Sequence, residues 1–175
     1  CGGKEPLQPL QMPEQGVVLH PDDDLWDSIV IASRKALKNF EGEPNDILAI
    51  GLCTIRCCRA SLKEDGTLFS PVLSWMDLRL SKPYEFEDPA VRYVTTSSGY
   101  ISHRFTGEFK DTASNYEGPW PIDKDRWNWS DNPQVLENYR LPEDMLFELV
   151  NPGSILGYAT AQAAQATGFP EGIPV

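Results

Sequence analysis

Residues 46–52 have the sequence DILAIGL, and this stretch decides the fold class. From Ile47 to Leu52 it is a continuous apolar run of about the length of one β-strand. The run lacks the alternation of a half-buried strand, so we expect helices to cover both of its faces. The loop that follows carries Arg56 and Cys57, and open α/β sheets place ligands at the carboxyl ends of their strands. The stretch therefore predicts a layered α/β domain and makes the loop at residue 56 a candidate binding site.

Helical and extended segments alternate on both sides of this stretch. Residues 21–40 have apolar residues at helical spacing, aspartates in the first turn and basic residues near the end, which predicts an amphipathic helix. In the first half of the chain we also expect an extended lead-in or edge strand at 16–19, a hairpin turn at 65–66, a strand at 71–75 and a loop at 81–90. A short helix or irregular segment at 100–105 and an ordered loop at 111–133 follow. The last expected elements are one or two helical turns at 142–150, a strand at 155–158 and a helix at 161–167 ended by Gly168. This order predicts one α/β domain with a mixed sheet.

The balance of charge limits the partners of the chain. It has 15 basic and 26 acidic residues, and its formal net charge is −11. Binding to nucleic acid or to an anionic membrane surface needs clustered basic residues, so the composition argues against both. No apolar run reaches the length that spans a bilayer.

Three of the four cysteines, Cys53, Cys57 and Cys58, lie within six positions of one another. A disulfide scaffold spreads its cysteines along the chain, so this clustering favours a reducing, cytoplasmic compartment. A metal- or redox-responsive site is the alternative, but the cluster has no CxxC pair and no neighbouring histidine. The simpler interpretation is that Cys53 is buried as a small apolar residue and that its neighbours line a loop.

No motif of a Rossmann site, a P-loop, a zinc protease or a serine hydrolase is present, so function must rest on less distinctive clusters. Arg56 could bind hydroxyls or a carboxylate through its five donors, or it could form a surface ion pair. Trp75 could stack on a sugar ring while Asp77 and Arg79 supply acceptors and donors. The alternative is a core tryptophan beside an Asp–Arg pair that closes a turn.

Two further groups of residues favour structural roles. Trp120, Trp127 and Trp129 lie in the expected loop at 111–133, where aromatic side chains more often fix a long loop to its domain than bind a carbohydrate. His20 directly precedes the expected helix, so we interpret it as a local cap rather than as a catalytic base.

Taken in order, several short segments resemble the FGGY carbohydrate kinases, the family of glycerol, xylulose, gluconate and related kinases. The segments are HP at 20–21, DILAIGL at 46–52, DGT at 65–67, SWMDLR at 74–79, RFTGE at 104–108, GSILG at 153–157 and GFPEGIPV at 168–175. The order of the set, rather than any single motif, carries the resemblance.

The resemblance implies a ribonuclease-H-like (actin-like ATPase) α/β fold, with a mixed sheet and flanking helices, of which this chain is an incomplete part. Members of the family have two such domains around a cleft and bind sugar mainly on the first and ATP mainly on the second. Residues 1–175 would then be part of the N-terminal sugar-binding domain. The substrate-binding residues implied by the resemblance are Arg56, Cys57, Trp75, Asp77 and Arg79, the last two through the family's W-x-D-x-R pattern.

The implied activity is phosphorylation of a sugar or polyol hydroxyl by a cytoplasmic kinase that uses ATP and Mg²⁺. The family's catalytic aspartate follows the segment seen here as GIPV at 172–175, and its D-x-G-T motif precedes the part seen here. We therefore expect this chain to be inactive without the C-terminal ATP-binding domain, and a homodimer is left open. Ile55 in place of a common glutamine, and a short connection at 80–98, leave the sugar undecided. A non-catalytic sugar-binding sensor or scaffold is the alternative function.

Overall fold

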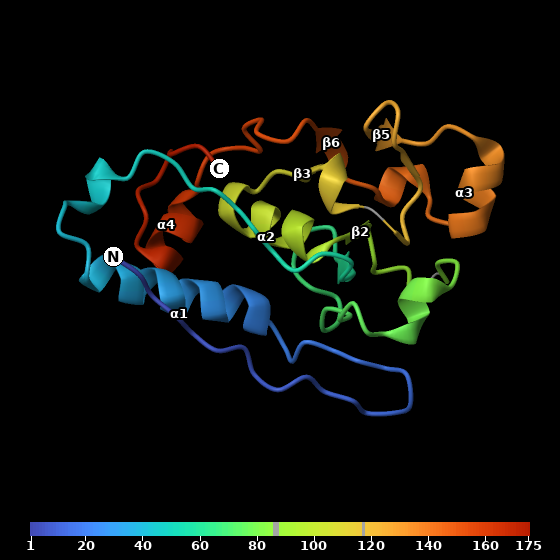
Figure 1. Ribbon diagram of the computed structural model, residues 1–175, viewed down its shortest axis with the longest axis horizontal. Helices are drawn as coiled ribbons and strands as arrows, with labels where there is room; N and C mark the ends of the chain where they lie inside the picture. Colours follow the sequence, from blue (N-terminus) through green and yellow to red (C-terminus); the bar gives the residue numbers. More distant parts are fainter. Residues whose placement is uncertain (86–87, 117) are drawn as a thin grey trace.

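The computed structural model describes residues 1–85, 88–116 and 118–175 of the 175-residue chain (Figure 1). The helices of this part are α1 (Asp24–Lys38), α2 (Ser97–Thr106), α3 (Pro133–Tyr139) and α4 (Ala161–Thr167). Its strands are β1 (Ala60–Leu62), β2 (Tyr93–Thr95), β3 (Lys110–Thr112), β4 (Ile122–Asp123), β5 (Asn128–Trp129) and β6 (Glu148–Val150). Short 3-10 turns lie at Pro44–Asp46, Leu78–Ser81, Ala113–Asn115 and Glu143–Met145. Residues 86 and 87 of the loop expected at 81–90, and residue 117 of the loop expected at 111–133, lie outside the described residues.

Within the described residues the strands pair in twos and form three small sheets. The pairs β1–β2 and β4–β5 are antiparallel, whereas β3–β6 is parallel. Leu73 extends the first sheet because it bridges both Arg59 and Leu19. The expected segments at 16–19 and 71–75 are therefore extended and bridged without forming regular ladders. The mixed α/β class is confirmed, in the form of short, separate sheets.

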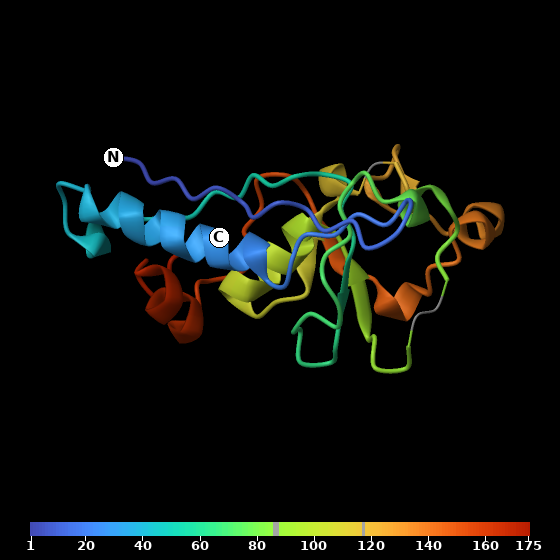
Figure 2. The same ribbon diagram turned by 90° about the horizontal axis from the view of Figure 1, so that it is seen from below.

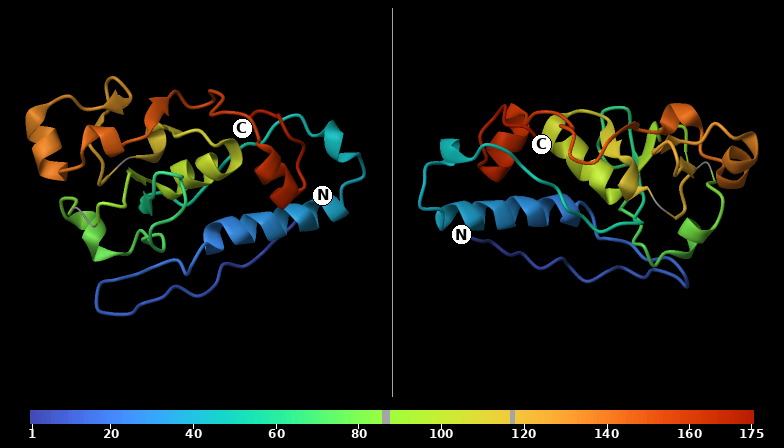
Figure 3. Two further views of the ribbon diagram at one scale, coloured as in Figure 1. Left: turned by 180° about the vertical axis from the view of Figure 1, so that it is seen from behind. Right: turned by 45° about the horizontal axis from the view of Figure 1, so that its top comes forward.

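Helix α1 is the amphipathic helix that the sequence predicts. Asp24 and Asp27 in its first turn, and Lys35 and Lys38 in its last, complement the helix dipole. It packs against α2 and α4 (Figure 3), and α4 ends at Gly168 with a φ of 86°, also as predicted. Figures 1 and 3 place α4 and α3 in opposite halves of the molecule along its long axis. None of the described helices is long and apolar enough to cross a lipid bilayer.

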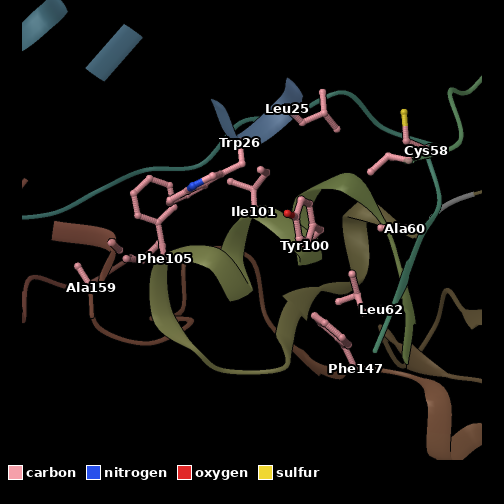
Figure 4. Close-up of a cluster of buried hydrophobic side chains, with 13 residues drawn as sticks. Leu25, Trp26, Cys58, Ala60, Leu62, Tyr100, Ile101, Phe105, Phe147 and Ala159 are labelled. Atoms are coloured by element: carbon pink, nitrogen blue, oxygen red, sulfur yellow. The ribbon is translucent and has the colours of Figure 1, made fainter. Parts of the chain in front are cut away.

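Helix α2 lies in the middle of the main core (Figure 4). The Thr96 hydroxyl caps its N-terminus by accepting the Gly99 N–H at 3.2 Å, and Gly107, with a φ of 73°, ends it. Figure 4 shows Tyr100, Ile101 and Phe105 of this helix in the core together with Trp26, Leu62 and Phe147 from other segments. Because this helix is buried on nearly every side, it fixes the positions of the elements that surround it.

We predict that Gly99→Ala destabilises the complete protein that contains this chain by about 2 kcal/mol. Alanine is favoured over glycine in a helix by about 1 kcal/mol, but overpacking a core typically costs about 1–3 kcal/mol. A Cβ at this position would lie 2.0 Å from Thr95 Oγ1 and 2.9 Å from the Tyr116 hydroxyl, so it would also disturb their 2.6 Å hydrogen bond. Thermal unfolding measures the loss. Gly51→Ala is the control, because a Cβ there meets no atom within 4 Å, and an equal loss in both variants would contradict the steric argument.

The apolar run at 47–52 does not form the buried strand that we expected. Leu48 is 79% exposed. Two backbone hydrogen bonds are described for the run: a local one from Ile47 N–H to Pro44 O at 3.1 Å, and one to a distant segment, from Ile50 N–H to Pro174 O at 2.9 Å. A strand is covered on both faces only when neighbouring strands and helices surround it. Within the described residues the run bonds to a distant segment on one edge alone, so Leu48 stays in solvent, while Ile50 and Leu52 are partly buried against the main core.

The hairpin turn at 65–66 is confirmed. The Lys63 N–H donates to Thr67 O at 2.9 Å, and Gly66 takes the positive φ, 76°, that this turn requires. The Asp65 carboxylate closes the turn by accepting the Thr67 hydroxyl and N–H. Figure 2 shows this hairpin projecting from one side of the molecule.

Short, irregular elements replace several of the expected elements after residue 110. The segment at 155–158 forms an irregular antiparallel pair with residues 173–175: Leu156 N–H donates to Val175 O, and Tyr158 bridges Pro174. The helical turns expected at 142–150 reduce to the single 3-10 turn Glu143–Met145, which leads into β6. The loop expected at 111–133 contains the 3-10 turn Ala113–Asn115 and the small hairpin of β4 and β5.

Candidate functional site

A pocket of about 540 Å³ lies between the loop after Trp75 and the C-terminal end of α3. Cys57, Trp75 and Asp77 line it, so three of the five residues expected at the substrate site lie together. Arg56 and Arg79 are neighbours of these residues in sequence but are not part of the lining. Such a volume is within the usual range of small-molecule sites, about 300–1,000 Å³.

Asp77 and Arg79 form the turn that shapes one wall of this pocket. The buried Asp77 carboxylate accepts the Val18 N–H at 2.9 Å and the Arg79 N–H at 3.0 Å. It also accepts Nε and Nη2 of Arg79, at 2.8 and 2.7 Å. Burial opposes ionisation, but these hydrogen bonds outweigh it and lower the pKa of Asp77 below its ordinary value. Of the two interpretations, the Asp–Arg pair that closes a turn is the one that the contacts support, and the carboxylate offers no free acceptor to a ligand.

Trp75 is 59% exposed, so the alternative of a core tryptophan is wrong. The neighbouring Met76 and Leu78 are also exposed, and all three line the pocket. An exposed indole at the wall of a pocket can stack on the apolar face of a sugar ring.

The burial of the cysteines differs from the expectation. Cys53 is exposed, and Cys58 is the buried one. Burial raises the pKa of the Cys58 thiol. Cys57 has a φ of 63°, a left-handed conformation that is uncommon for a residue with a side chain. The described residues contain no group of three or more His, Cys, Asp or Glu side chains that could hold a metal ion.

His20 is not the local cap that we expected. Its side chain is buried, and its Nε2 lies 3.9 Å from Cys58 Sγ, while Nδ1 has no hydrogen-bond partner in the structure. Burial lowers the pKa of His20, so it is a neutral core histidine. The His20 backbone N–H donates to Val72 O, so the residue lies beside the extended segment at 71–75.

The loop at 111–133, which we call the aromatic loop, is fixed to the domain by two of its three tryptophans. Trp120 is buried, and Trp129 donates its Nε1–H to Phe147 O at 2.7 Å. Trp127 is instead largely exposed. Expectation and structure therefore agree for two positions.

The sequence analysis missed lining residues from two other segments. Lys82 follows the turn Leu78–Ser81, and Asn138 and Tyr139 end α3. The Tyr139 hydroxyl donates to Gly118 O at 3.1 Å, which joins α3 to the aromatic loop. The one local signal was the Asn132-Pro133 pair, which starts α3 with a side-chain cap. Nothing in the sequence indicated that the end of this helix would face Trp75.

A second polar centre surrounds Asp111, beside a cavity of about 510 Å³. Its carboxylate is fully buried and accepts Thr96 Oγ1 at 3.0 Å, Ser98 Oγ at 3.1 Å, Thr112 N–H at 2.8 Å and Asn115 Nδ2 at 2.7 Å. Burial raises the pKa of Asp111, and the four hydrogen bonds lower it by less. The network joins the start of α2 to the end of β3, so it stabilises the centre of the fold.

Comparison with known proteins decides the family. No protein-family model matches the chain. Over all 175 residues it is 50% identical to the uncharacterized sugar kinase YgcE of Escherichia coli (strain K12), of which it covers 36%. The gluconate kinase from Lactobacillus acidophilus has the same fold, with a TM-score of 0.78 over 95% of this chain and 40% of that chain, at 13% identity. The chain belongs to the FGGY-type sugar kinases.

Further members of the FGGY-type sugar kinases agree. The xylulose kinase from Rhodospirillum rubrum has a TM-score of 0.76 over 98% of this chain and 42% of that chain, at 22% identity. The glycerol kinase of Thermococcus kodakarensis is 21% identical over 189 residues and aligns with 86% of this chain. The chain spans only 36–42% of the length of these proteins. Its fold is accordingly a segment of the actin-like fold of the FGGY-type kinases.

Proposed function

We propose that the complete protein containing this chain transfers the γ-phosphoryl group of ATP to a hydroxyl of a sugar or polyol. Residues 1–175 would supply much of its N-terminal sugar-binding domain. The observation that carries the proposal is the meeting of Cys57, Trp75 and Asp77 at one pocket in a chain that is 50% identical to a sugar kinase. We assign the sugar to this pocket, with Arg56 and Arg79 shaping the surrounding loops.

The residues of this chain would bind and orient the sugar rather than perform the chemistry. Trp75 would cover the apolar face of the ring, and the Asp77–Arg79 pair would hold the loop that presents it. The described residues lack a carboxylate cluster that fits Mg²⁺. We therefore place the groups that would contact ATP and Mg²⁺, and the proton-accepting aspartate, in the rest of the protein, in particular in its C-terminal ATP-binding domain.

The test compares Trp75→Ala with Trp75→Phe in the complete protein. Sugar-dependent ADP release with ATP and Mg²⁺ measures kcat/KM over a panel of sugars and polyols. We expect the alanine variant to lose at least about tenfold in kcat/KM and the phenylalanine variant to retain most of it, because only an aromatic ring stacks on the sugar. Since Trp75 is 59% exposed, neither change should lower the thermal midpoint appreciably.

Two outcomes would count against the proposal. If no sugar stimulates ADP release although sugars bind saturably, the protein is the non-catalytic sugar-binding sensor instead. If Trp75→Ala leaves kcat/KM unchanged, the sugar lies elsewhere than in this pocket.

A further inference from the structure

The charge of the pocket beside Trp75 differs from that of the chain as a whole. Of the described residues that line it, only Asp77 and Lys82 are charged. The Asp77 side chain has no exposed surface, and its carboxylate accepts two hydrogen bonds from the Arg79 guanidinium and two from backbone N–H groups. The negative charge is therefore neutralised and closed off from a ligand in the pocket.

Among the described residues that line the pocket, the Lys82 ammonium is the charge without a counter-charge. Lys82 follows the turn Leu78–Ser81 directly, and its backbone N–H bonds Arg79 O at 3.4 Å, which fixes the start of its side chain at the wall. No carboxylate among the described residues lies within ion-pair distance of its Nζ. A lysine ammonium is a compact, strongly hydrated cation with three donors, so an anionic group of a ligand is its natural partner here.

We infer that this pocket takes an anionic sugar, an aldonate or a uronate, and that Lys82 binds its carboxylate. The inference rests on the proposed function, which assigns the sugar to this pocket, and it adds the class of sugar. Trp75 would cover the carbon chain or ring, and Asn138 at the end of α3 adds an amide that can bind hydroxyls. A chain with a net charge of −11 repels anions in general, so a site for one requires such a local positive charge.

Another cavity has the opposite character. It measures about 810 Å³, and four acidic residues line it, Asp22, Asp23, Glu64 and Asp65, against the single arginine Arg104. Arg104 already pairs with Asp23 and lies over the Trp26 ring, 4.5 Å from its centroid. An anionic ligand would be repelled there, so the charge distribution directs an anionic sugar to the pocket with Lys82.

The experiment measures binding separately from catalysis in the complete protein. Isothermal titration calorimetry without ATP compares D-gluconate and D-galactonate with the matched neutral alditols, D-glucitol and galactitol. We expect the aldonates to bind more tightly, and we expect added salt to weaken them selectively. In Lys82→Met the ratio of aldonate to alditol affinity should fall about tenfold, and Lys82→Arg should restore part of it.

Lys124→Met is the matched control, since Lys124 is exposed in the β4–β5 turn and does not line the pocket. Alditols that bind as tightly as aldonates, aldonates that fail to bind, or an unchanged ratio in Lys82→Met would each overturn the inference. ADP release assays keep the two proposals apart. Phosphorylation of neutral polyols without any aldonate preference would reject the inference and retain the kinase. Selective aldonate binding without phosphorylation of any sugar would retain the inference and reject the kinase.

Discussion

Asp111→Ala is expected to lower the free energy of unfolding by about 3 kcal/mol or more. The substitution leaves four donors, on Thr96, Ser98, Thr112 and Asn115, without the fully buried carboxylate that accepts from them. An unsatisfied buried polar group costs about 1–3 kcal/mol, and some of the four will find new partners. Chemical denaturation of the complete protein, followed by tryptophan fluorescence, measures the loss.

Asp111→Asn is the control for this prediction. The amide keeps the shape, its oxygen can accept from Ser98, Thr112 and Asn115, and its NH₂ can donate to Thr96 Oγ1. We therefore expect a much smaller loss than for alanine.

The pH dependence of these two proteins provides a second check. Burial raises the folded pKa of Asp111 above the unfolded value of about 3.9, so this carboxyl favours folding most when it is protonated. That contribution declines as the pH rises through the folded pKa. The stability advantage of the wild type over Asp111→Asn should thus narrow between pH 4 and neutrality, and a widening gap would contradict the assigned shift.

Asp77→Ala is expected to cost about 2–3 kcal/mol of stability and, in the complete protein, at least about tenfold in sugar affinity. The Arg79 guanidinium is half exposed and can turn to water, so the loss comes mainly from the charge-assisted bonds and from the buried Val18 N–H. The affinity falls because the turn that presents Trp75 is released. Because the pKa of Asp77 is lowered in the folded state, its contribution is present above about pH 4 and is lost as the pH falls through the folded pKa.

Asp123→Ala is the matched control for Asp77→Ala. Asp123 likewise accepts the backbone N–H and the Nε of a nearby arginine, Arg126, but this pair lies on the surface of the β4–β5 hairpin. Water and salt screen exposed pairs, so this change should affect stability much less and sugar affinity not at all. Equal effects of the two substitutions would refute the role of burial at Asp77.

The elements that the sequence predicted well are those fixed by local signals. Helix α4 lies where its alanine-rich segment and Gly168 placed it, and the hairpin turn at Asp65 and Gly66 needed only the residues of the turn itself. The run at 47–52 was misjudged because burial depends on neighbours that the sequence of the run cannot reveal. Exposure of Leu48 is a property of the surroundings and not of the leucine.

The polar centres could not be predicted from the sequence for a related reason. The Asp111 network joins this residue to others 1 to 15 positions away, and the His20–Cys58 contact joins residues 38 apart, with no recognisable spacing in either case. For the candidate sugar pocket, the resemblance indicated Trp75 and Cys57 from one side. The contribution of α3 depends on how the chain folds back, so Asn138 was assigned only from the structure, and so was Lys82, which follows the turn Leu78–Ser81.

The open backbone edge of the run at 47–52 has a consequence for the chain during synthesis. An apolar, strand-like segment with one unpaired edge is a template on which another copy can pair, and such pairing leads to aggregation. Until neighbouring strands cover that edge, an emerging chain would depend on chaperones or on rapid folding to avoid this fate. Inclusion bodies on overexpression of the 175-residue piece alone would therefore be no sign of a defective sequence.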